Sequence, residues 1–304
     1  MRKPRDSSLD WLLANAAMKL LALSAIMKVE NIENGIDFPP FNIPIRRYLA
    51  GHRRAMAIVM PAMGTTASFY QPFAEELGTR GFSVLVPELP GTGESRPRPS
   101  WKVDYGYRDL VETYLPQLVK SAREIGQTVP LVLMGHSLGA HAGTLAVATA
   151  SIEVDALVTI AGGNIHYLNW SGVGALKVLF AASLFSTLSR LFGQMPGQYF
   201  GFGGPQARTL IRQWSRIIFT GQYSHIYNDL KAGGSVPSLC IGYQGDELAP
   251  EESVAGLAAV LNSDIEISPV SWPGNPHSSW ARNPVESVDF IENWLARNNV
   301  ISQQ

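Results

Sequence analysis

The stretch Leu131-Val132-Leu133-Met134-Gly135-His136-Ser137-Leu138-Gly139 decides the fold of this 304-residue chain. Its first four residues are apolar and predict a short buried strand. The last five match the pattern G-x-S-x-G. The small residues Ala140, Ala142 and Gly143 follow and predict the start of a helix. A strand, a sharp turn and a helix form the setting in which a serine becomes an exposed nucleophile. Because larger side chains at 135 and 139 would crowd the backbone, we expect Ser137 to hold a strained conformation.

The composition limits the classes of protein to which the chain can belong. The length is enough for one large α/β domain or two small ones, and the hydrophobic content of 46% supports a sizeable core. Lys and Arg number 24 against 25 Asp and Glu, which argues against nucleic acid as a partner. The single cysteine, Cys240, excludes an internal disulfide, and the Cys and His positions lack metal-ligand spacing. We therefore expect no metal and no cofactor.

The N-terminus is rich in Leu, Ala and Met from 9 to 29 and follows three basic residues. Its apolar positions recur with helical spacing, so we predict an apolar or amphipathic helix as a separate segment over 1–35. Asn15 and Lys19 interrupt the run, which makes it a poor membrane span. Two interpretations stay open: a helix docked on the domain or on a second subunit, or a peripheral membrane contact through 9–29. We expect a cytoplasmic protein, with membrane association through this helix as the alternative.

Strands alternate with helices along the rest of the chain. Strands are expected at 41–48, 55–60, 82–86, 131–134, 156–160, 237–243 and 265–270. Helices are expected at 69–77, 105–125, 137–149, 251–261 and 284–297, with Pro116 kinking or splitting the second. This alternation is typical of a mostly parallel sheet covered by helices on both faces. The core would comprise residues 36–163 and 235–304.

The alternation breaks once, over 164–234. This segment is rich in apolar and aromatic residues and is far longer than an ordinary connection between a strand and a helix. We predict an inserted helical cap, which could be a small satellite core, a lid over the active site, or both. Its candidates for substrate contact are Trp170, Phe180, Phe185 and Trp214.

A serine nucleophile needs a base, and the chain has six histidines. His277 lies in the loop after the last predicted strand, on the sheet edge where the turn at Ser137 also lies. The other histidines are less suited by position: His136 inside the turn, His141 in the following helix, His52 in an early turn, and His166 and His225 in the cap. We therefore predict His277 as the base.

The orienting acid and the oxyanion donors are expected at the same edge of the sheet. Asp246 comes just after the strand 237–243 and lies between Ser137 and His277 in chain order, as an orienting acid should. The oxyanion needs two backbone N–H groups. Leu138, directly after the nucleophile, would supply one, and Met63, in the loop after the strand 55–60, the other.

With these residues in place, the chain resembles the serine hydrolases of α/β-hydrolase fold over residues 40 to 300. The resemblance is carried by 135–139, by Pro90-Gly91-Thr92-Gly93-Glu94-Ser95, by Gly245-Asp246 and by His277. Glu88 stands where the family usually has Asp, and Pro61-Ala62 where it often has His-Gly. The second departure changes the surroundings of the oxyanion donor. The resemblance implies a central, mostly parallel sheet with helices on both faces and an inserted cap.

The expected function is hydrolysis of a carboxylic ester, or a related acyl compound, with an apolar moiety and without a cofactor. An acyltransferase or a thioesterase would use the same three residues, and a non-catalytic binding module is a further alternative. The pattern leaves the substrate and the oligomeric state open.

Overall fold

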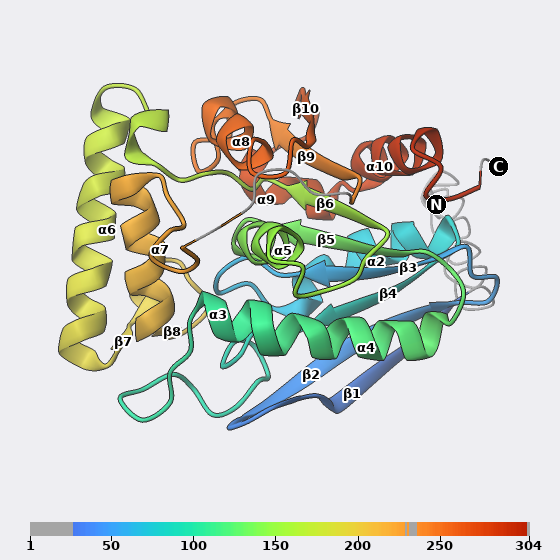
Figure 1. The fold of residues 1–304 in the computed structure, drawn as a ribbon, viewed down its shortest axis with the longest axis horizontal. Coiled ribbons are helices and arrows are strands. Elements are labelled where there is room, and N and C mark those ends of the chain that lie inside the picture. The colour runs from blue at the N-terminus through green and yellow to red at the C-terminus, as the bar shows by residue number, and fades with distance from the viewer. Residues whose placement is uncertain (1–26, 229, 231–235, 303–304) are drawn as a thin grey trace, which may run out of the picture.

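The computed structural model describes residues 27–228, 230 and 236–302. They form an eight-stranded sheet of order β1-β2-β4-β3-β5-β6-β9-β10, in which only β2 runs against its neighbours (Figure 1). The strands are β1 (Met27–Phe38), β2 (Phe41–Ala50), β3 (Ala55–Met60), β4 (Phe82–Pro87), β5 (Leu131–His136), β6 (Ala156–Ile160), β9 (Ser238–Tyr243) and β10 (Asp264–Ser268). The predicted mostly parallel sheet is confirmed.

The central strands β3, β4, β5, β6 and β9 are buried along their whole length. Continuous apolar sequence of this kind is required when helices cover both faces of a sheet. On one face lie α2 (Gln71–Thr79) and α10 (Val285–Arg297); on the other lie α4 (Leu115–Gly126), α5 (Leu138–Ala148) and α8 (Glu251–Ala258). Each face has its own buried apolar cluster, so the sheet is held between two cores.

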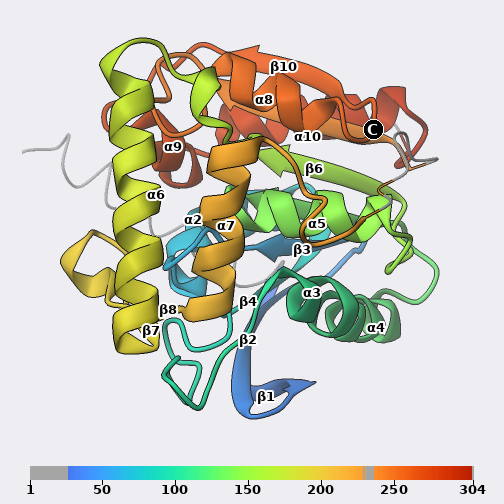
Figure 2. The same cartoon turned by 60° about the vertical axis from the view of Figure 1, so that its left-hand side comes forward.

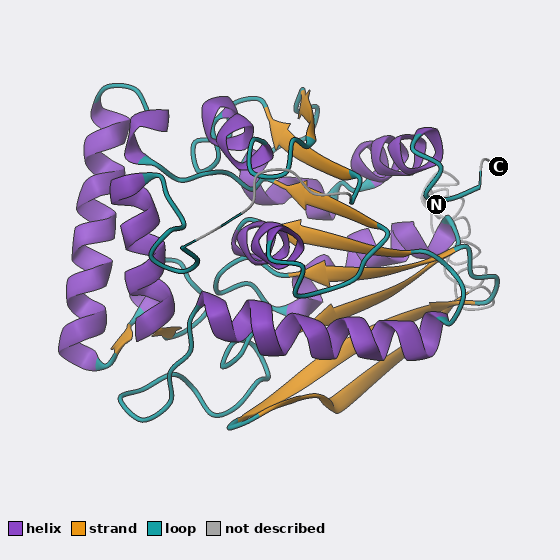
Figure 3. Ribbon diagram, viewed as in Figure 1, coloured by secondary structure: helices purple, strands orange, loops and turns teal. Residues whose placement is uncertain are grey.

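The carboxyl ends of the parallel strands all point toward the cap (Figure 3). The cap is a hairpin of two helices, α6 (Val173–Phe192) and α7 (Arg208–Thr220), which lie side by side in Figures 1 and 2. The two-stranded pair β7 (Gln194–Met195) and β8 (Gln206–Ala207) joins them. A small core of Phe185, Met195 and Ile211 holds the hairpin together. The cap therefore stands over the edge where strand-end residues gather.

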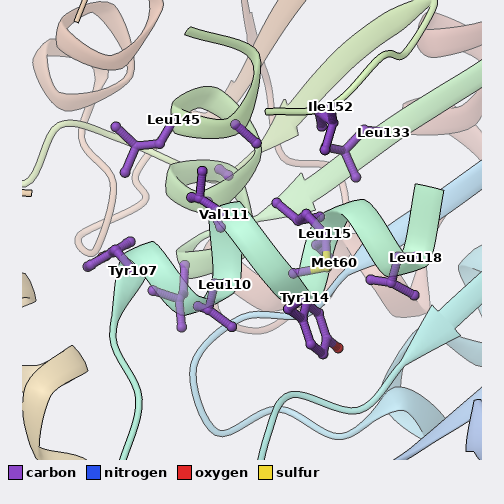
Figure 4. Close-up of a cluster of buried hydrophobic side chains, with 14 of the residues drawn as sticks. Met60, Tyr107, Leu110, Val111, Tyr114, Leu115, Leu118, Leu133, Leu145 and Ile152 are labelled. Atoms are coloured by element: carbon purple, nitrogen blue, oxygen red, sulfur yellow. The ribbon is translucent and has the colours of Figure 1, made fainter. Parts of the chain in front are cut away.

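The predicted helix over 105–125 consists of three consecutive helical elements, and its change of helix type lies next to Pro116. It consists of α3 (Tyr107–Asp109), a π-helical turn η2 (Leu110–Tyr114) and α4, with the N–H of Leu115 bonded to the carbonyl of Leu110. The wider π turn lies just before Pro116, where the proline ring and its missing N–H would disturb an α-helix. The residues of this turn pack into the core beside α5 (Figure 4).

The N-terminal prediction is wrong where it can be checked. Residues 1–26 lie outside the described residues, but 27–38, part of which was expected to be helical, form β1. β1 pairs antiparallel with β2 from Met27↔Ala50 to Phe38↔Phe41. Ile36 and Phe38 are buried there, so pairing with the next strand, β2, overrides the local helical spacing. A membrane contact through 9–29 stays a prediction.

Short helical turns complete the described chain. They are η1 (Ala67–Tyr70), η3 (Tyr167–Asn169), η4 (Gly197–Tyr199), α9 (Pro276–Ser279) and η5 (Trp280–Arg282). Of these, η1 and α9 border the site described next.

Candidate active site

The turn at Ser137 has the strained geometry expected from its glycines. Ser137 has φ 51° and ψ −106°, a conformation that L-residues rarely adopt. A Cβ on Gly135 would collide with the backbone of Gly139, and a Cβ on Gly139 would collide with the carbonyl of Met60. The serine N–H donates to the carbonyl of Ile160 at 3.2 Å. The turn is thus held between β3, β5 and β6, with Ser137 at the wall of a cavity of about 520 Å³.

Asp246 and His277 meet at this edge. The Asp246 Oδ2 and the His277 Nδ1 are 2.9 Å apart. The other carboxylate oxygen accepts hydrogen bonds from the N–H groups of Leu248 at 2.8 Å and Ala249 at 3.1 Å. Gly245, at φ 76°, makes the tight turn that follows β9. The carboxylate side chain is fully buried, so it holds one edge of the imidazole and leaves Nε2 free to act on a substrate.

Ser137 and His277 line the same cavity. The Ser137 Oγ has no hydrogen bond within the described chain, to His277 or to any other group. A contact between nucleophile and base is often long before substrate binds. His277 itself is placed by Asn275, whose side chain caps α9 by accepting from the His277 N–H at 3.0 Å.

The two predicted oxyanion donors also line this cavity. Neither the N–H of Met63 nor that of Leu138 has a hydrogen-bond partner in the described part of the chain. Leu138 is the first residue of α5, so its N–H points out of the helix end. Two unpartnered N–H groups beside a serine are what an oxyanion hole requires.

A buried chain of hydrogen bonds links the oxyanion loop to the base, and sequence reasoning missed it. The N–H of Ala62 donates to the Tyr70 hydroxyl oxygen at 2.8 Å, and the Tyr70 O–H reaches the His136 Nδ1 at 2.8 Å. The His136 Nε2 lies 2.8 Å from the carbonyl oxygen of His277. Burial holds the pKa of His136 well below its ordinary value, so the ring is neutral. The network then assigns the proton to Nε2, which donates to that carbonyl.

These hydrogen bonds explain how the protein accommodates its departure from the family pattern at Pro61-Ala62. Where the family often has His-Gly, the phenol of Tyr70 holds the loop that carries Met63. The replacement could be suspected from a tyrosine seven residues after Met63, but its contact with His136 depends on where η1 packs. The departure at Glu88 is also accommodated. Its buried carboxyl accepts from the N–H of Ala67 at 3.1 Å, and burial raises its pKa to about 7.

The four cap candidates have different surroundings. Trp214 lines the cavity of Ser137. Trp170 lines a neighbouring cavity of about 880 Å³ and donates from Nε1 to the carbonyl of Glu247 at 2.7 Å. Phe185 is buried inside the cap, against Phe200, Phe202 and Trp214.

Phe180 corrects the prediction, because it is 69% exposed and lines neither cavity. It lies on the face of α6 opposite to the buried Ala182 and Phe185, so the rotation of the helix excludes it. Sequence reasoning also missed the loop 201–203, which lines the cavity and whose Gly203 N–H donates to the carbonyl of Gly64 at 3.0 Å. The cap is thereby fastened to the oxyanion loop.

The comparisons with known proteins bear on the family and the fold. The model of the "Alpha/beta hydrolase family" matches residues 57–293. None of the curated proteins matches the chain in sequence. Among solved structures, a soluble variant of monoglyceride lipase from Saccharomyces cerevisiae, in complex with a substrate analog, has a TM-score of 0.65. It is 11% identical, with 92% of this chain and 96% of that chain covered.

Two further solved structures are similar. A putative lipase from Acinetobacter baumannii AYE has a TM-score of 0.59 at 18% identity, with 91% of this chain and 97% of that chain covered. An esterase from Pyrococcus furiosus has a TM-score of 0.55 at 16% identity, with 91% of this chain and 92% of that chain covered. At these identities the likeness establishes the fold, and the residues must carry the chemistry.

Proposed function

The chain belongs to the alpha/beta hydrolase family, and on that premise we propose that it is a serine hydrolase that cleaves carboxylic esters with an apolar moiety. The observation that carries the proposal is one cavity lined by Ser137, by His277, which is held by Asp246, and by the residues of two unpartnered N–H groups. These are the four functions that acyl transfer needs: nucleophile, base, orienting acid and oxyanion donors.

The mechanism follows from these positions. The Ser137 Oγ attacks the ester carbonyl while the His277 Nε2 accepts its proton, and Asp246 stabilises the imidazolium. The N–H groups of Met63 and Leu138 bind the oxyanion of the tetrahedral intermediate. The C–O bond of the ester then breaks, and His277 gives its proton to the departing alcohol. Water, deprotonated by His277, attacks the acyl-enzyme and releases the acid, returning the proton to Ser137.

The lining of the cavity favours an apolar substrate. Phe69, Ile165, Phe202, Trp214 and Leu248 all border it, and its volume of about 520 Å³ falls in the range of small-molecule sites. An acyl chain or an apolar alcohol would bury its surface there. A peptide would instead need partners for its many backbone polar groups.

The test is a panel of esters of increasing acyl length together with a fluorophosphonate probe. Wild type should hydrolyse the esters and be labelled, whereas Ser137→Ala should lose labelling and at least about 10⁴-fold in turnover. Ser278→Ala is the matched control, because Ser278 lines the same cavity away from the turn. Undiminished labelling of Ser137→Ala would contradict the assignment.

The same panel separates the alternative acceptors. Product analysis with a competing alcohol, amine or thiol distinguishes a hydrolase from an acyltransferase, and thioester substrates distinguish a thioesterase. Absence of turnover and labelling in wild type would favour a binding module.

A further inference from the structure

The cap exposes apolar side chains on the outer side of α6, in a stripe that the exposed Ser183 and Thr187 interrupt. Val173, Leu176, Phe180 and Leu191 are each between 65% and 69% exposed. Their spacing of three, four and eleven residues places them on one face of the helix. With 20 residues, α6 is about 30 Å long. Isolated exposed apolar side chains are ordinary on a protein surface, but a row of this length marks an interaction surface.

The opposite face of α6 is buried. Ala182, Phe185 and Ser189 point toward α7 and the cap core. In the described part of the chain, α6 is the one helix whose length and apolar composition would suffice to cross a membrane. Because one side of it packs on a helix with three arginines, α7, it suits a position in the plane of an interface rather than across a bilayer.

The charge of the cap is one-sided. Residues 164–228 include Lys177, Arg190, Arg208, Arg212 and Arg216 and contain no Asp or Glu, although the whole chain has a formal net charge of −1. Arg208 pairs with Asp104 of the core at 3.2 Å. The other four cations have no ion-pair partner within the described ranges 27–228 and 236–302.

Two of these cations border the stripe. Lys177 and Arg190 lie on α6 to either side of it, whereas Arg212 and Arg216 are exposed on α7, which packs against the other face of α6. The two helices run side by side in Figure 2. Tyr199, in the connection between α6 and α7, is a further aromatic residue of the cap that is exposed, at 78%. An apolar row with a cationic border is complementary to an anionic lipid surface, which offers hydrocarbon below negative headgroups.

We propose that the outer face of the cap docks on anionic lipid membranes, with α6 lying in the interface. Leu176, Phe180 and Leu191 enter the acyl region, and the unpaired cations contact the headgroups. A second copy of the chain fits less well, because a symmetric cap-to-cap contact would bring like charges together. The inference goes beyond the proposed function, since binding needs neither Ser137 nor turnover.

The docked surface would also lie beside the substrate route. Lys177 and Val178 of α6 line the cavity of about 880 Å³, which shares Leu248 with the cavity of Ser137. Leu248 is 56% exposed. A lipid leaving the membrane next to α6 would therefore reach the catalytic cavity along this wall.

The test is flotation of the full chain with phosphatidylcholine vesicles, with and without phosphatidylglycerol, at low and high salt. Wild type should float with the anionic vesicles, and salt should weaken binding. The triple variant Leu176→Ser, Phe180→Ser, Leu191→Ser should bind at least about tenfold more weakly. Lys177→Gln with Arg190→Gln should weaken binding to anionic vesicles by roughly tenfold.

Two controls make the result specific. Val285→Ser removes an apolar side chain that is 50% exposed on α10, on the far side of the sheet from α5, and should float like wild type. Ser137→Ala should also float like wild type, so that failure of the enzymatic proposal and failure of this one are distinguishable. Turnover of a short water-soluble ester, or fluorophosphonate labelling, shows that the cap variants are folded.

Three outcomes would overturn the proposal. Wild type failing to float with anionic vesicles is the first, and floating equally well without phosphatidylglycerol is the second. The third is a concentration-dependent dimer in solution that the triple variant abolishes, which would assign the stripe to a second copy of the chain.

Discussion

The carboxyl edge of the sheet and the outer face of the cap are built on opposite principles. At the edge, polar groups such as Asp246 and His136 are buried and hydrogen-bonded at both of their polar atoms. On the cap, apolar side chains such as Phe180 are exposed and most cations stand without an ion-pair partner in the described chain. The edge is preorganised for chemistry, whereas the outer face of the cap is suited to binding a partner.

From this difference we expect substitutions in the two regions to have different effects. Changes at the edge disturb the geometry of reacting groups and should lower the rate for every substrate. Changes in the cap should alter which substrates are used, or where the protein lies, and leave the chemical step intact. The predictions below test this division.

The largest effect is expected for Asp246→Asn. The amide cannot stabilise the imidazolium and favours the wrong tautomer of His277, so kcat should fall by about 10⁴-fold for short and long esters alike. Steady-state kinetics measures it. Glu247→Gln, the exposed neighbour, is the control and should stay close to wild type. A loss of kcat confined to long esters would contradict the expectation that substitutions at the edge affect every substrate.

Trp214→Ala should have a smaller and selective effect. Removing a ring that lines the cavity should lower kcat/KM for long acyl chains by about 10- to 100-fold and leave acetate esters nearly unchanged. Phe180→Ala removes an aromatic side chain of the same cap that faces away from the cavity. It should leave both substrates unaffected in detergent-free solution, and equal losses in the two variants would contradict the geometry.

Tyr70→Phe tests the buried chain that joins the oxyanion loop to His277. It leaves the N–H of Ala62 without an acceptor and His136 without a donor, so we expect a loss of about 1–3 kcal/mol in the free energy of unfolding. We also expect a roughly tenfold fall in kcat, because Met63 follows Ala62 directly.

The control for that variant is Tyr107→Phe. Its hydroxyl lies 2.9 Å from the Nδ1 of His141, a similar buried pair that does not touch the oxyanion loop. Chemical denaturation should show comparable destabilisation of the two variants, and only Tyr70→Phe should be slower. Equal kcat values for the two variants would mean that the hydrogen bonds of Tyr70 have a purely structural role.

Glu88 should make the stability of the fold depend on pH. Burial raises its pKa from 4.5 to about 7, so the folded state keeps a proton that the unfolded state loses. Its contribution to stability is fully present below pH 4.5, falls as pH rises to about 7 and is constant above that. Thermal unfolding from pH 4 to 8 should show this decline in wild type relative to Glu88→Gln. Parallel curves for the two proteins would refute it.

Much of the edge could be predicted because its signals are local. Gly135 and Gly139 lie within two residues of Ser137, Asp246 lies in the turn after β9, and His277 lies in the segment that follows β10. Parallel strands carry such residues to one edge whatever the details of packing. The cap gave weaker signals, since helical spacing shows that two sides differ and cannot show which side meets the cavity. Phe180 and Trp214 have similar sequence surroundings and opposite placements.

The α/β-hydrolase sheet, the sharp turn at Ser137 and the order of the three candidate catalytic residues could be predicted from the sequence. The structure was needed to find that 27–38 form β1, that Tyr70 and His136 join the oxyanion loop to His277, and which face of α6 is exposed. The reason is physical: steric strain and strand propensity act between neighbours in the chain. Buried hydrogen bonds and the rotation of a helix depend on partners that lie far along it, and the pairing of β1 with β2 overrides the helical spacing within β1.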